Sequence, residues 1–75
     1  MDFKRAARQV LAEVGRPLRY TDITELALKD GYLRSAGRTP QNTMRARLSV
    51  DVRDNPDSAF AQTAPGVYGL SEWKK

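Results

Sequence analysis

The stretch TPQNTMRARLSVDV, residues 39–52, carries the clearest helix signal in the chain. Thr39 offers a hydroxyl for the N-cap, and Pro40 suits the first helical position because its φ is fixed and its missing N–H is not needed there. Met44, Leu48 and Val52 then recur every four residues, which places them on one face. We therefore predict a helix over about residues 40–54 that packs this face on a core.

The rest of this helix surface is polar and basic. The side opposite the apolar face is predicted to carry Asn42, Ala46, Ser49 and Arg53, with Arg45 and Arg47 on the two flanks. From residue 31 to residue 50 the chain holds four arginines and no acidic residue, and the remainder holds nine cations and nine acids. The net charge of +4 is therefore matched by this one stretch.

Two shorter helices are predicted upstream. The apolar stripe of the first is Phe3, Ala7, Val10, Leu11 and Val14, at helical spacing. Gly15 occupies the place of a left-handed C-cap, and Pro17 prevents the helix from continuing. The following Leu18-Arg19-Tyr20 is interpreted as a short extended link or small edge strand.

The second helix is expected between Thr21 and Gly31. The hydroxyl of Thr21 is its predicted N-cap, and Gly31 is predicted to close it. The stripe Ile23, Leu26 and Ala27 would face the core. The three tyrosines, Tyr20, Tyr32 and Tyr68, are assigned to the margin of the core.

The C-terminal part is predicted to form a hairpin. Residues 59–63 and 67–70 suit two short strands, and Pro65 followed by Gly66 suits the central positions of a type II turn. The order helix, short strand, helix, helix, hairpin is that of a winged helix-turn-helix. We expect a mainly α fold, with three helices and a wing, forming one domain over residues 1–75.

The sequence contains neither cysteine nor histidine. The first absence removes disulfides and thiolate metal sites, and the second removes the commonest general base and metal ligand. We therefore expect no enzyme, metal site, cofactor or small-molecule substrate. No apolar run approaches the ~20 residues of a membrane span. The expected location is cytoplasmic, on the nucleoid in a bacterium, without a membrane partner.

Taken in order, several motifs resemble the HARE-HTH domain, a winged-helix module of Asx-like chromatin proteins, restriction-type nucleases and the RNA polymerase delta subunit. The resemblance runs from about Phe3 to Leu70 and implies a nucleic-acid or chromatin adaptor, usually fused to an effector. Its polymerase-subunit members bind a protein. The residues that carry it are Phe3, Ala6, Ala7, Val10 and Leu11; Gly15, Pro17, Leu18, Tyr20 and Ile23; Gly31-Tyr32-Leu33; Thr39-Pro40, Thr43 and Leu48; Phe60; and Pro65-Gly66-Val67-Tyr68 with Leu70.

Double-stranded DNA is the expected partner, because the basic stretch coincides with the recognition helix of a helix-turn-helix protein. Gln41 and Asn42 suit adenine edges and Arg45 suits guanine. Arg34, Arg38 and Arg47 suit phosphates, as do the free N–H groups that follow Thr39 and Pro40. Ala46 and Ser49 complete the expected contact face, where Ala46 or the methyl of Thr43 could touch a thymine or methylcytosine methyl group.

Two observations keep other interpretations open. The predicted wing, residues 58–70, carries no basic residue, so it would gain little from counterion release and is expected mainly to cover the core. A second basic set, Lys4, Arg5, Arg8, Arg16 and Arg19, fits scattered surface charge better than a backbone footprint. The alternative function is a protein-interaction module that docks on RNA polymerase, a nuclease effector or another nucleic-acid-processing complex, with Val50 as an exposed apolar contact.

Overall fold

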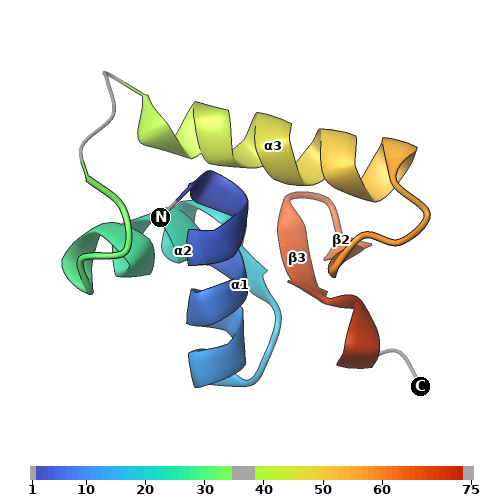
Figure 1. Cartoon of the computed structure of the whole chain (residues 1–75), viewed down its shortest axis with the longest axis horizontal. Coiled ribbons are helices and arrows are strands. Elements are labelled where there is room, and N and C mark those ends of the chain that lie inside the picture. Colours follow the sequence, from blue (N-terminus) through green and yellow to red (C-terminus); the bar gives the residue numbers. More distant parts are fainter. Residues whose placement is uncertain (1, 35–38, 74–75) are drawn as a thin grey trace.

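The computed structural model describes residues 2–34 and 39–73, so the predicted contact Arg38 lies outside the described residues. No helix within these ranges is long and apolar enough to cross a membrane. The elements follow the predicted order (Figure 1): α1 (Phe3–Val14), β1 (Leu18–Arg19), α2 (Tyr20–Lys29), α3 (Pro40–Asp54), β2 (Phe60–Ala64), β3 (Val67–Leu70) and a 3-10 turn, η1 (Ser71–Trp73).

The three strands form one antiparallel sheet with the order β1-β3-β2. The link after α1 is therefore an edge strand, in which Leu18 pairs with Tyr68. The β2–β3 hairpin begins one residue later than predicted, and its turn contains Gly66 at a φ of +73°, as a type II turn requires. Three helices and a small sheet in this arrangement confirm the winged helix-turn-helix.

All three helices and the sheet contribute to a single core. In Figure 1, α3 lies across one end of α1 and above the hairpin. The core was predicted correctly except for Tyr68, which is only 1% exposed instead of marginal. Its burial is possible because its hydroxyl hydrogen bonds to the hydroxyl of Ser49 on α3, at 2.7 Å.

The helix ends decide how α3 is presented. Gly15 ends α1 at a φ of +80°, as predicted. The N-cap prediction for Thr21 is wrong, because α2 begins at Tyr20 and no side chain caps it. After α2, Gly31 also has a φ of +80°, and the Tyr32 N–H donates to the Ala27 carbonyl at 2.9 Å. This Schellman-type ending confirms the role of Gly31 and turns the chain towards α3.

Candidate nucleic-acid interface

The helix α3 is held by a narrow apolar face. Met44 and Leu48 are fully buried, and Val52 packs against the edge of the core. At its start, Thr39 occupies the N-cap position and Pro40 the first helical position, but the Thr39 hydroxyl makes no hydrogen bond to the helix. The N–H groups of the first turn therefore have no side-chain cap, and they face an approaching anion together with the positive end of the helix dipole.

Three of the four residues predicted to lie opposite the core do so. Asn42, Ala46 and Arg53 are exposed, and Gln41 at the helix start is half-buried. Ser49 was predicted to point outward with them, and that prediction is wrong. Its hydroxyl is bound by Tyr68 beneath the helix, so the outward surface of α3 is smaller than the sequence suggested.

The two central arginines of α3 lie on opposite flanks, as predicted. On one flank, the Arg45 guanidinium lies over the ring of Tyr20, 5.8 Å from its centroid. On the other, Arg47 and Lys4 line the same two surface hollows, between α3 and the N-terminal turn of α1. Neither arginine forms an ion pair with a residue in 2–34 or 39–73. Both guanidinium groups therefore keep their donors available to a ligand.

The larger hollow beside Arg47 has a volume of about 350 Å³. It combines the small side chain of Ala46, the exposed side chain of Val50 and the ammonium of Lys4. The Lys4 ammonium lies 3.3 Å from a carboxylate oxygen of Asp51, which forms another part of the wall. This hollow joins the outward face of α3 to the start of α1.

The C-terminal third of α3 has a different charge character. Arg53 donates to its neighbour Asp54 at 2.9 Å, which lowers the pKa of the Asp54 carboxyl and raises the pKa of the Arg53 guanidinium. Asp51 accepts from the Ser58 hydroxyl, and this hydrogen bond is the main reason why the pKa of the Asp51 carboxyl is lowered. Only the N-terminal two-thirds of the helix therefore presents uncompensated positive charge.

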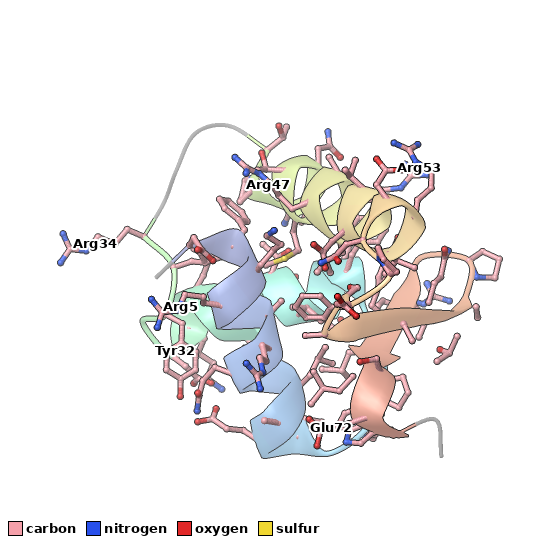
Figure 2. The ribbon with its side chains drawn as sticks, turned by 45° about the vertical axis from the view of Figure 1, so that its right-hand side comes forward. Arg5, Tyr32, Arg34, Arg47, Arg53 and Glu72 are labelled. Carbon is pink, nitrogen blue, oxygen red and sulfur yellow. The ribbon has the colours of Figure 1, made fainter. Side chains whose placement is uncertain are left out.

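The segment that leads into α3 is anchored by a tyrosine. The Tyr32 hydroxyl donates to the Glu13 carboxylate near the end of α1, which raises the pKa of Tyr32 and lowers the pKa of Glu13. Arg34 follows two residues later and is exposed; Figure 2 shows it extending away from the fold, well apart from Arg47. The structure thus does not bring Arg34 together with the arginines of α3.

The wing lies against the protein and carries no charge of its own. Its exposed residues from Gln62 to Pro65 are uncharged, and the Gly66 carbonyl accepts from the Tyr20 N–H at 3.0 Å. Tyr20 therefore contacts both the turn of the wing and Arg45 of α3. Beside it, Arg19 is exposed on β1, paired with Val67 next to that turn.

Sequence reasoning missed Tyr20 as a support of Arg45, and Lys4 as a neighbour of Arg47. Each contact joins residues far apart in the chain, so no local periodicity reports it. The alternation of Leu18 and Arg19 was the available signal for β1, but it did not show that β3 was the partner strand.

Comparison with known proteins completes the description. Searches of curated proteins and of solved structures found no match. A family model for the HARE-HTH domain, described as the HTH domain of ASXL proteins and restriction endonucleases, matches residues 1–73. This match covers nearly all of the 75 residues and agrees with both the motif order and the three-helix, three-stranded fold. The chain belongs to the HARE-HTH family.

Proposed function

We propose that this chain is a non-enzymatic module that binds double-stranded DNA, mainly through the N-terminal two-thirds of α3. It would act as an adaptor that senses DNA sequence or base modification for an effector. The proposal is supported by membership in a family of helix-turn-helix domains. Helices of this type enter the major groove with their N-terminal residues towards the base edges.

The observation that carries the proposal is the state of Arg45 and Arg47. Both are exposed and lack an ion pair within residues 2–34 and 39–73, and no acidic residue lies between Pro40 and Val50. Arginines that served only solubility would be expected to mix with acids, as they do at Arg53 and Asp54. Exposed and uncompensated guanidinium groups on this helix suit a polyanion.

The proposed roles follow from position. Asn42, Ala46 and Arg45 would face base edges, with Gln41 and Thr39 at the helix entrance. Arg47 would bind a phosphate, as would Arg34 and Arg38 if the DNA extends past the start of the helix. The methyl groups of Ala46 and Thr43 are the candidates for recognising a thymine or methylcytosine. Ser49 has its hydroxyl engaged by Tyr68, so we assign it to the support of α3.

A salt titration of fluorescence anisotropy tests this proposal. Wild type would be titrated with a labelled duplex beside Arg45→Ala/Arg47→Ala, with Arg53→Ala as the control on the same helix. We expect the double variant to bind more weakly, and its log–log salt slope to fall by about two, because each phosphate contact contributes about 0.9. The control should match wild type, since Asp54 already neutralises Arg53. Equal binding by the double variant and wild type would refute contact through α3.

Tyr20 provides a second, more specific prediction. Replacing Tyr20 with leucine removes the ring beneath the Arg45 guanidinium, and a cation–π contact at an exposed site contributes about 0.5–1 kcal/mol. We expect Tyr20→Leu to bind duplex DNA roughly two- to fivefold more weakly. Tyr20→Phe keeps the ring and should bind like wild type. Anisotropy at fixed salt measures both variants, and thermal melts show whether each remains folded.

The opposite pattern would contradict this role of Tyr20. If phenylalanine weakened binding as much as leucine, the hydroxyl and not the ring would be responsible. If leucine bound like wild type, Arg45 would not depend on Tyr20 for its orientation.

Val50 favours one alternative, a module that docks on a protein such as RNA polymerase or a nuclease effector. Its side chain is 45% exposed on α3, more than any other large apolar side chain in the described ranges, and it lines the hollow beside Lys4. In that case partner binding would survive Arg45→Ala/Arg47→Ala and fail in Val50→Asp. The reverse pattern is expected if DNA is the partner.

A further inference from the structure

We infer that α1 supplies a second anchor for DNA, in which Arg5 and Arg8 bind phosphates of the strand that passes Arg47. This inference rests on the proposed function and extends it. It assigns the accessory contact, which a wing often supplies in this fold, to the opposite flank of α3.

The first argument concerns where positive charge remains without a partner. Arg5 and Arg8 are exposed on α1 and form no ion pair with the residues that the structure describes. Together with Gln9 and Ala12 they line a surface hollow of about 360 Å³ that contains no acidic side chain. Figure 2 shows Arg5 projecting outward from α1 on the same side of the view as Arg47 and away from Arg53. This surface therefore offers donors to an anion and no carboxylate to repel it.

The second argument is continuity with α3. Lys4 is shared by the hollow that contains Arg47 and by the neighbouring hollow that contains Arg5 and Arg8. Two carboxylates lie in the second hollow, and Asp51 among them is bound by Lys4 and Ser58. Asp57, the other, is exposed in the turn before β2. A strand leaving Arg47 would thus meet Arg5 and Arg8 next, with Lys4 between them.

The third argument is that these cations do not suit the stability of α1. They occupy its N-terminal half, next to the positive end of the helix dipole, and the first turn contains no acidic residue. Lys4 and Arg8 are four residues apart, and Arg5 and Arg8 three, so like charges are neighbours on the helix surface. A requirement for folding would not place three cations there, whereas a requirement for binding a polyanion would.

The fourth argument is the charge of the wing. No described residue from Ser58 to Trp73 is basic, and its turn is packed on Tyr20. The hairpin can therefore release few counterions from DNA. On the flank of α3 that faces α1, Arg47, Lys4, Arg5 and Arg8 together provide the larger set of cations.

A matched pair of double variants tests this inference in the whole chain. Arg5→Gln/Arg8→Gln removes two charges from the proposed anchor. Arg16→Gln/Lys29→Gln removes two charges from a hollow that also contains Asp22 and Glu25. Both would be titrated by anisotropy against salt, beside wild type and Arg45→Ala/Arg47→Ala, and their melting temperatures would be measured. Glutamine preserves helix propensity, so the comparison isolates charge position.

We expect Arg5→Gln/Arg8→Gln to bind at least about tenfold more weakly at about 0.1 M salt, with a salt slope lower by about two. Its melting temperature should be unchanged or higher, because like charges are removed near the helix N-terminus. The control pair should stay within about twofold of wild type. That combination separates a local anchor from the effect of net charge.

Three results would overturn the inference. Equal weakening by both pairs would show that only total charge matters. Unchanged affinity in Arg5→Gln/Arg8→Gln, with loss in Arg45→Ala/Arg47→Ala, would remove the α1 anchor and leave the proposed function intact. Absence of duplex binding by wild type at low salt would reject both.

Discussion

Leu48→Ala should lower the free energy of unfolding by about 3 kcal/mol, because truncation of a buried leucine typically costs about 2–5 kcal/mol. Leu48 is completely buried, and with Met44 it is one of only two fully buried side chains on α3. The structure therefore concentrates the attachment of its recognition helix in two residues. A cavity at Leu48 removes a large part of that attachment.

The effect should be large relative to total stability. A domain of 75 residues is expected to have roughly 4–11 kcal/mol in all. At roughly 4–8 °C per kcal/mol for a domain of this size, the melting temperature should fall by about 10–20 °C. Thermal unfolding followed by circular dichroism measures the shift, and urea unfolding gives the free energy.

Val50→Ala is the matched control for Leu48→Ala. Val50 lies two residues away on the same helix and is 45% exposed, so its truncation should change stability by less than about 0.5 kcal/mol. Similar losses in both variants would mean that helix propensity, and not packing on the core, holds α3 in place. A loss below about 1 kcal/mol in Leu48→Ala would contradict the packing described above.

The features predicted correctly from the sequence are those that depend on neighbouring residues. The stripe Met44, Leu48 and Val52, the proline at the start of α3, and the glycines that end α1 and α2 all act through spacings of a few residues. Their physics is local, so they can be inferred before the fold is known. The order of elements then left the winged helix-turn-helix as the matching arrangement.

The errors share the opposite property. Tyr68 was placed at the core margin and Ser49 on the outer face, and both errors come from one hydrogen bond between β3 and α3. Such a bond depends on how a strand and a helix nineteen residues apart are packed together. The same is true of Tyr20, which meets Arg45 and Gly66 only after the sheet has formed. A tyrosine that satisfies its hydroxyl can be fully buried, whereas its amphipathic character alone suggests the margin.

Asp51 should make the stability of the domain depend on pH. Its carboxylate accepts from Ser58, Asn55 and Lys4, and its side chain is only 10% exposed. These contacts join the end of α3 to the turn before the wing and to α1. Hydrogen bonds to a charged group contribute about 1.5–3 kcal/mol, so Asp51→Ala should cost about 2 kcal/mol at neutral pH.

The sign of the pH dependence follows from the lowered pKa of the Asp51 carboxyl, whose main cause is the Ser58 hydrogen bond. Between the folded and unfolded pKa values the unfolded chain binds more protons, so stability rises with pH in that interval. The contribution of Asp51 is thus complete above a pH of about 4 and is lost as the pH falls through the folded-state pKa. Urea unfolding at pH values from about 2 to 7 should show wild type and Asp51→Ala converging in acid.

Asp54→Ala separates this effect from that of an exposed carboxyl on the same helix. Its pKa is also lowered, by Arg53, but its side chain is 58% exposed and solvent screens the pair. We expect little change in stability at any pH, since exposed pairs usually contribute between 0 and about 1 kcal/mol. If Asp54→Ala lost as much as Asp51→Ala, charge at the end of α3 would explain the result. If only Asp51→Ala loses stability at neutral pH, the contacts to Ser58 and Lys4 are responsible, and they hold the end of α3 against the proposed DNA anchor on α1.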